Sequence, residues 1–283
     1  YVAQTTMPSD TEFNNTFTPS PVKVNLEFDK SLSNGTLNAG DFSFTLTGDN
    51  NVNETVTNKA NGKINFSELS FDQVGVYNYT VKEVKGDKAD VVDYDAMTIA
   101  VKVTVTKDAS TGLLSAKTAM TSTGGEATGE DDKVFNNFAV APVTTQFDFS
   151  KALSGRTLKA GEFSFVLKDK DGNVIQTKQN DAAGKVKFDA LTFTNAQVGD
   201  HKYTVEEVIP ETKEAGMTYD PMKAEVTVTV TKAGHTLTAT KVLPTDTEFN
   251  NTFTPGATTA QFSFTKKLEG KELTKDAFTF ELV

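Results

Sequence analysis

Three polar side chains interrupt apolar rows of this sequence, and together they could carry out a reaction. Two internal repeats each place one Lys, one Glu and one Asn at equivalent positions on three predicted strands. These residues are Lys30, Glu83 and Asn137 in the first repeat, and Lys151, Glu207 and Asn251 in the second. Burying any one of them alone is costly, because an unpaired polar or charged group loses its hydration. A set that recurs in register therefore indicates a role that its members share.

The three residue types together suit amide-bond formation. Burial lowers the pKa of a lysine and raises that of a glutamate, so a buried pair could exist as a neutral amine and a neutral acid. A neutral amine is a nucleophile, and the asparagine side chain offers an amide carbon. A protonated glutamate could donate to the amide oxygen and then relay protons from the attacking nitrogen to the leaving one. Ammonia would depart and a Lys–Asn isopeptide bond would remain.

This chemistry happens once per repeat and needs no cofactor and no metal. The module modifies only itself and does not turn over a substrate, so we do not expect the protein to be an enzyme. The alternative interpretation is a lysine whose charged end reaches the sheet edge, or a Lys–Glu ion pair beside a hydrogen-bonded asparagine. One such lysine would favour that alternative, whereas a matched set on three strands of each repeat favours the covalent reaction.

Strand parity places these residues on the inward face. Successive strand side chains point to opposite faces, and Lys30 falls in the row of apolar residues. The same holds for Glu83 behind two tyrosines and a valine. In the first repeat the parity of the last strand is less clean, and Asn137 is chosen by matching it to the second repeat. The inward rows are Val22, Val24, Leu26, Phe28, Lys30 and Leu32, then Tyr77, Tyr79, Val81 and Glu83.

Longer identities define the repeat. Residues 10–19 return unchanged as residues 246–255, and equivalent motifs recur about 120 residues apart, the size of a small domain. We therefore predict the end of a preceding module at 1–19, module one at 20–140, module two at 141–255 and the start of a third module at 256–283. Asn15 and Lys266 would be the same reactants from neighbouring modules, with partners outside this chain. A chain that opens at Tyr1 is expected to be a cut fragment.

Alternating Val, Thr and Phe predict an all-β fold. Runs such as residues 99–105 and 226–230 alternate apolar and polar side chains, and Asn-Gly and Asp-Gly turns separate them. Each module should be a β-sandwich of roughly seven to nine strands. Short joints that contain proline predict tandem modules in an extended rod. We expect the acidic segment 124–132 to be a mobile, solvated loop, since its spacing does not suit Ca²⁺.

The composition argues against two classes of binding partner. The net charge of -10 argues against nucleic acid and anionic membranes, which attract Lys and Arg. No apolar run is long enough to be inserted across a bilayer. The chain has no Cys, so an extracellular version must be stabilised by something other than disulfides.

The motifs in this order resemble a known family. Phe-x-Lys-x-Leu, Tyr-Thr-Val-x-Glu and Phe-Asn-Asn are similar to the isopeptide-linked repeat domains of Gram-positive pilins and surface adhesins, of the streptococcal T-antigen or major backbone pilin type. The resemblance implies immunoglobulin-like sandwiches in a shaft or stalk, extracellular on the bacterial surface, with neighbouring modules as partners and the cell wall reached through other parts. It pairs Lys30 with Asn137 and Lys151 with Asn251, assisted by Glu83 and Glu207.

Two other functions remain open at this point. The modules could be adhesin domains that recognise host matrix or cell-surface molecules through their loops, although no aromatic cluster or charged groove marks one. A glycosidase would need a second acidic residue that recurs beside each glutamate, and none does. The chain shows no sorting signal and no pilin polymerisation motif, as a fragment could. The near-identical modules in one chain fit a long adhesin stalk better than a polymerised pilin subunit.

Overall fold

The computed structural model describes residues 1–283, and all of its strands lie between Val22 and Phe253. The first sandwich contains β1 (Val22–Val24), β2 (Glu27–Ser33), β3 (Ser43–Gly48), β4 (Val52–Thr57), β5 (Lys63–Asn65), β6 (Leu69–Phe71), β7 (Gly75–Val84), β8 (Val92–Asp93), β9 (Thr98–Lys107), β10 (Leu114–Thr123) and β11 (Val134–Ala139). The second contains β12 (Val143–Thr145), β13 (Asp148–Ser154), β14 (Ser164–Lys168), β15 (Val174–Gln179), β16 (Lys185–Lys187), β17 (Leu191–Phe193), β18 (Gly199–Glu207), β19 (Met217–Thr218), β20 (Lys223–Ala233), β21 (Thr236–Val242) and β22 (Glu248–Phe253).

Helical structure is confined to three single turns. They are the 3₁₀ segments η1 (Asp49–Asn51), η2 (Asp87–Asp90) and η3 (Asn195–Gln197). No helix here has the length and hydropathy that a membrane crossing requires. The predicted all-β fold is thereby confirmed.

Each sandwich packs a five-stranded sheet against a four-stranded sheet. In the first, the orders are β10-β9-β7-β3-β4 and β5-β2-β11-β8. In the second they are β15-β14-β18-β20-β21 and β16-β13-β22-β19. Phenylalanines from the two layers meet in the core, where the rings of Phe44 and Phe135 lie 5.2 Å apart and those of Phe165 and Phe249 lie 5.0 Å apart. Such aromatic contacts add to the free energy gained by burying the rings.

Each module has eleven strands, more than the expected seven to nine, and one of the extra strands arises because the first long strand is broken. β1 pairs with β6 in a small separate sheet, whereas β2 pairs with β5 and β11. Leu26, between β1 and β2, is buried in the core. The chain thus changes partners within a stretch that the alternation pattern predicted as one continuous strand.

The first and last long strands of each module lie side by side and run parallel. β11 pairs with β2 in the register Phe135 to Lys30 and Asn137 to Leu32. β22 pairs with β13 in the equivalent register, with Asn251 opposite Leu153. Because side chains alternate between faces, the lysine and the asparagine two positions along share the inward face of one sheet.

The segment 124–132 is a mostly exposed loop with contacts that the sequence did not predict. It folds back over the edge of the first sandwich, where the backbone N–H of Glu126 donates to Asp95 and Ala127 packs against the core. Gly125 has a positive φ and lies so close to Asp95 and Met97 that a side chain would not fit. The segment is thus the exposed loop that the sequence predicted, and these contacts hold part of it against the sandwich.

Residues 1–19 and 256–283 form no strand in the structure. Both segments carry the motifs of sandwich strands, but neither pairs with a sheet in this structure. An isolated strand leaves its backbone groups unpaired and its apolar side chains exposed, as the exposure of Phe13 and Phe264 shows. The predicted strands at the two ends are therefore not formed here.

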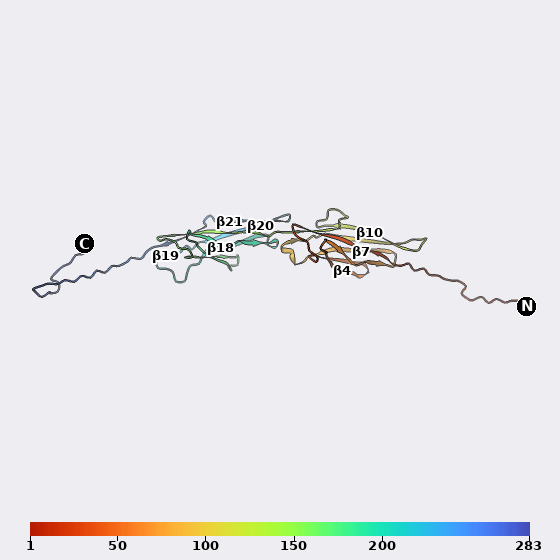
Figure 1. The fold of residues 1–283 in the computed structure, drawn as a ribbon, viewed down its shortest axis with the longest axis horizontal. Helices are drawn as coiled ribbons and strands as arrows, with labels where there is room; N and C mark the ends of the chain where they lie inside the picture. Colours follow the sequence, from red (N-terminus) through yellow and green to blue (C-terminus); the bar gives the residue numbers. More distant parts are fainter.

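The two sandwiches lie end to end, and the termini lie at opposite ends of the molecule (Figure 1). Direct contacts join them. Asp93 accepts hydrogen bonds from His235 at 2.7 Å, from Asn195 at 2.8 Å, and from Lys232. The His235 ring stacks on Phe138 with a centroid distance of 3.5 Å and an interplanar angle of 5°. The extended rod predicted from the proline-containing joints is confirmed, and specific side-chain contacts add to it.

The charge on Asp93 persists to low pH. Burial alone would raise the pKa of Asp93, but the hydrogen bonds from Lys232, His235 and Asn195 outweigh it and lower the pKa. A carboxylate with a lowered folded pKa contributes stability above its unfolded pKa of about 3.9 and loses that contribution as the pH falls through the folded value. The carboxylate contacts of the joint should therefore hold at neutral and mildly acidic pH.

Substituting Asp93→Ala should loosen the joint while both modules stay folded, because it removes the acceptor that three donors share. Small-angle X-ray scattering should show a wider distribution of module orientations and a shorter mean end-to-end length. Asp90→Ala, at an exposed residue of η2, makes the same change in charge and should have no effect. An unchanged scattering profile for Asp93→Ala would show that the Asp93 contacts do not set the geometry of the joint.

Candidate crosslink site

Three elements in two layers bring the predicted residues of module one together. Lys30 lies on β2 and Asn137 on the neighbouring β11, both in the four-stranded sheet. Glu83 lies near the end of β7 in the facing five-stranded sheet. The site is therefore closed only when the two sheets pack together.

The Glu83 carboxylate contacts both other side chains. Lys30 Nζ donates to Glu83 Oε2 at 3.1 Å, and Asn137 Nδ2 donates to Glu83 Oε1 at 2.7 Å. The side chains of Lys30 and Glu83 are 0% and 1% exposed. One carboxylate thus bridges the amine nitrogen and the amide nitrogen inside the core.

Module two repeats this geometry with β13, β22 and β18. Lys151 Nζ donates to Glu207 Oε2 at 2.8 Å, and Asn251 Nδ2 donates to Glu207 Oε1 at 2.7 Å. The side chains of Lys151 and Glu207 are both fully buried. The same atoms of the same residue types meet in both modules, although most of the surrounding sequence differs.

Burial shifts the titration of the first pair. Removal from water lowers the pKa of Lys30 to about 8, against the opposing effect of the Glu83 charge. Burial likewise raises the pKa of Glu83. Burial also lowers the pKa of Lys151. Each change makes the neutral amine easier to reach, and only that form has a free electron pair for attack.

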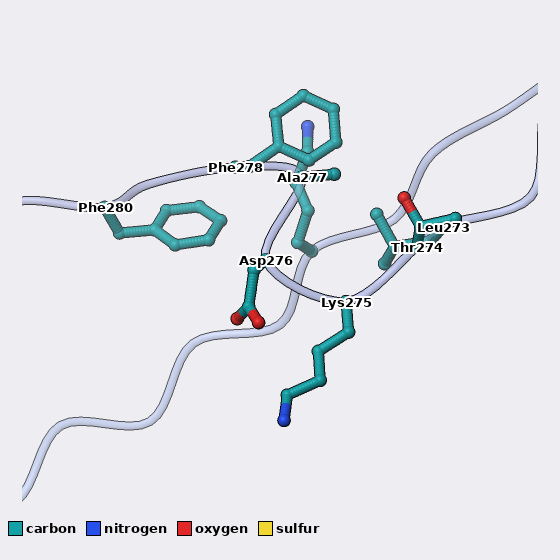
Figure 2. Close-up of a pocket in the computed structure, with 8 residues that line it drawn as sticks. Leu273, Thr274, Lys275, Asp276, Ala277, Phe278 and Phe280 are labelled. Carbon is teal, nitrogen blue, oxygen red and sulfur yellow. The ribbon is translucent and has the colours of Figure 1, made fainter.

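A phenylalanine covers each lysine nitrogen. Lys30 Nζ lies 4.8 Å from the ring centroid of Phe42, and Lys151 Nζ lies 4.6 Å from that of Phe163. In the third copy of the motif, Lys266 Nζ lies 4.8 Å from the ring of Phe278. There the ring belongs to a shallow surface hollow, which is lined by Lys266, by residues 273–278 and by Phe280 (Figure 2). The Lys–Phe contact is therefore local, and it forms without the strands that complete a site.

The two remaining predicted reactants are not brought to partners. Asn15 and Lys266 are both exposed, in the end segments that form no strand. Neither contacts a glutamate of the kind found in the complete sites. No group of three or more His, Cys, Asp and Glu side chains is placed to hold a metal ion.

The carboxylate faces a different amide atom from the one expected. The sequence argument has the glutamate donating to the amide oxygen, whereas Glu83 and Glu207 contact the amide nitrogen. The oxygens of Asn137 and Asn251 instead accept the backbone N–H of Asp95 and of Asp220, each at 2.8 Å. The glutamate is thus placed between the two nitrogens of the reaction.

Sequence reasoning missed Asp95 and Asp220. A signal was available, because Tyr94-Asp95-Ala96-Met97 and Tyr219-Asp220-Pro221-Met222 share the pattern Tyr-Asp-x-Met at the offset of the repeat. A repeated acidic residue between short strands is ordinary in a turn, so the pattern alone carries no chemistry. Only the structure shows that its backbone reaches the asparagine.

Comparison with known proteins identifies the family. Residues 26–138 and 147–254 each match the family described as "FctA: Spy0128-like isopeptide containing domain". The two segments make up well over half of the chain, so the protein belongs to this family. No curated protein sequence matches it.

Solved structures from Gram-positive bacteria are similar to this chain at low identity. The major pilin of Streptococcus pyogenes is 21% identical, with 84% of this chain and 98% of that chain covered and a TM-score of 0.32. The T-13 major pilin of Streptococcus pyogenes is 17% identical, with 83% and 98% covered and a TM-score of 0.32. A C-terminal fragment of the pilus adhesin SpaC from Lactobacillus rhamnosus GG is 13% identical, with 83% and 100% covered and a TM-score of 0.28.

An Asn137→Ala chain leaves Lys30 as a free amine and allows its titration to be followed. The Cε resonance of Lys30 should titrate near pH 8, because burial lowers its pKa. Exposed Lys23 and Lys63, whose pKa values are raised by the hydrogen bonds that they donate to the carboxylates of Glu68 and Asp29, should titrate above the ordinary value. Nuclear magnetic resonance of selectively labelled lysine measures both.

The same titration predicts a stability change of known sign. A lysine with a lowered folded pKa binds fewer protons than in the unfolded chain, so module one of Asn137→Ala should gain stability as the pH rises from about 8 towards the unfolded value near 10.4. Adding Lys30→Met should remove this gain. An unchanged pH dependence in the double variant would place the effect elsewhere.

Proposed function

We propose that each complete module forms one intramolecular isopeptide bond, between Lys30 and Asn137 and between Lys151 and Asn251. The observation that carries the proposal is the single buried carboxylate that contacts both the amine and the amide nitrogen, at matching distances in two modules. A structural ion pair would satisfy the lysine, but it gives no reason for a buried asparagine at the same carboxylate. Membership in a family described as isopeptide-containing supports the same reaction.

The reaction balances with the groups present. The neutral amine of Lys30 attacks Cγ of Asn137, which forms the Nζ–Cγ bond and leads to cleavage of the Cγ–Nδ2 bond. Nζ loses one proton to Oε2 of Glu83, and the carboxyl group delivers one proton from Oε1 to the departing Nδ2. Ammonia leaves and Glu83 regains its starting state. Holding the reactants in contact supplies the effective concentration that a reaction between free amine and amide would lack.

The fold gives such a bond a mechanical role. The bonded strands, β2 and β11 or β13 and β22, are the first and last long strands of their module. Because each pair is parallel, tension on the chain ends pulls the two strands in opposite directions and loads their hydrogen bonds in shear. A covalent bond between them would carry that force past the rest of the module, so we propose that the protein is a structural shaft.

The shaft is proposed to stand on the surface of a Gram-positive cell, as a pilus or as the stalk of an adhesin. Its partners would be neighbouring modules, and the cell wall would be reached through other parts of the parent protein. The crosslink would replace the disulfides that the chain lacks, without any need for an oxidant.

The intact mass of the purified chain tests the reaction directly. The expected mass is that of the sequence minus two molecules of ammonia, one for each complete module. Glu83→Gln should retain one of these ammonias and Glu83→Gln/Glu207→Gln both, because the proton relay is lost. A folded wild-type chain at the full sequence mass would rule out the crosslinks.

A thermal unfolding experiment tests whether the bonds act independently. Lys151→Ala should sharply lower the melting temperature of module two and leave module one nearly unchanged. A crosslink that closes a loop of about 100 residues raises the free energy of unfolding by roughly 4–5 kcal/mol, if the loop-entropy treatment of disulfides is applied. Differential scanning calorimetry resolves the two transitions, and equal losses in both would contradict independent crosslinks.

A further inference from the structure

We propose that the backbone N–H of Asp95 in module one, and of Asp220 in module two, stabilises the oxyanion that forms during crosslinking. The carboxylate of the same residue would act as a positioning group for that donor. This inference rests on the proposed function, because it assigns a further part of the same reaction. It concerns atoms that the Lys, Glu and Asn set leaves unassigned.

The orientation of the reacting amide follows from these contacts. A backbone N–H can only donate, so the atom that faces Asp95 N at 2.8 Å must be the oxygen of Asn137. Asp220 N stands at the same 2.8 Å from the oxygen of Asn251. The amide nitrogen then has to face the glutamate, which is where it must be to leave with a proton.

The aspartate side chain ties the donor to the strand of the reacting asparagine. Asp95 Oδ2 accepts the backbone N–H of Asn136 at 2.7 Å, and Oδ1 accepts that of Met97 at 2.8 Å. The carboxylate therefore pairs with the edge of β11 in place of a backbone carbonyl and closes a tight turn at the same time. The peptide N–H of Asp95 is left pointing at the next side chain along β11, which is Asn137.

Module two has the same three contacts. Asp220 Oδ2 accepts the N–H of Asn250 at 2.7 Å, and Oδ1 accepts that of Met222 at 2.9 Å. Between the aspartate and the methionine, module two has Pro221, which has no backbone N–H, whereas module one has Ala96. The turn therefore conserves only the donors and acceptors that this arrangement uses.

The chemistry of attack needs such a donor. When the amine adds to the amide carbon, negative charge moves onto the oxygen, and the buried glutamate cannot neutralise it while it contacts both nitrogens. A fixed N–H at hydrogen-bond distance does so without reorganisation, and it acts strongly because the site is dry. The asparagines are almost fully buried, with 0% of Asn137 and 2% of Asn251 exposed. The two groups thus have separate roles. The glutamate carboxylate transfers protons between the nitrogens, and the backbone N–H stabilises the charge on the amide oxygen.

The rate of ammonia loss in the full chain tests this role. The chain is made by cell-free synthesis at low temperature, and intact masses are recorded over time. In Asp220→Ala, module one serves as an internal clock. The backbone N–H of residue 220 remains but loses the carboxylate contacts that hold it in place, so loss of the second ammonia should slow, by up to the roughly 10²-fold that removal of one oxyanion donor causes. Glu248→Ala, which removes an exposed acidic side chain from β22, the strand of Asn251, should leave both rates unchanged.

A second variant distinguishes the effect of the N–H donor from the effect of the carboxylate that closes the turn. Replacing Asp220 by its α-hydroxy acid analogue turns the preceding peptide bond into an ester, which removes the N–H and keeps the carboxylate. This chain should be slowed as well, with the pH profile of the wild type, because Lys151 and Glu207 are untouched. Melting temperatures in the uncrosslinkable Lys151→Ala background show whether either change unfolds the module.

The outcomes distinguish this inference from the proposed function. A folded ester chain that loses its second ammonia at the wild-type rate would overturn the oxyanion role and leave the crosslink intact. A slowed rate that follows entirely from a lower folded fraction would also overturn it. A wild-type chain that never loses ammonia would instead refute the proposed function itself.

Discussion

A carboxylate shared by two nitrogens inside an apolar core is the interaction on which each module depends. Without Glu83, both the Lys30 amine and the Asn137 amide nitrogen would be buried with no acceptor, at a cost that a small sandwich can hardly absorb. With it, all three groups are paired, while burial lowers the pKa of Lys30 and raises the pKa of Glu83. The contact that satisfies the buried polar groups is also the one on which the proposed reaction depends.

The parallel arrangement of first and last strands determines where this contact can form. Parallel neighbours require a long connection, and in each module that connection is almost the whole sandwich. The lysine and the asparagine therefore lie far apart in sequence and adjacent in space, on the two strands that join the module to its neighbours. The glutamate comes from the opposite sheet, so one site binds together both layers and both ends of the module.

Much of this arrangement could be predicted from sequence because it follows from parity. Lys30, Glu83 and Asn137 stand in rows of apolar residues, and the repeat resolves the one ambiguous strand. Asp95 could not be assigned in this way, because it acts through its backbone N–H and its side chain resembles that of any turn. The contacts of Asp93 with His235 across the joint do not recur, so no periodicity reveals them. Alternation also could not show that the first strand changes partners near Leu26.

Because the reactants come from facing sheets, the site is complete only in a module whose two sheets have packed correctly. A module whose layers have not closed holds an intact lysine and an intact asparagine, separated and hydrated, and both remain unchanged. Once the layers close, the proposed reaction would record that event permanently, since the ammonia that leaves is lost to the solvent. In a chain of such modules, each crosslink would mark a module that has folded correctly. Any module that misfolded would stay open to the proteases that a sealed neighbour resists.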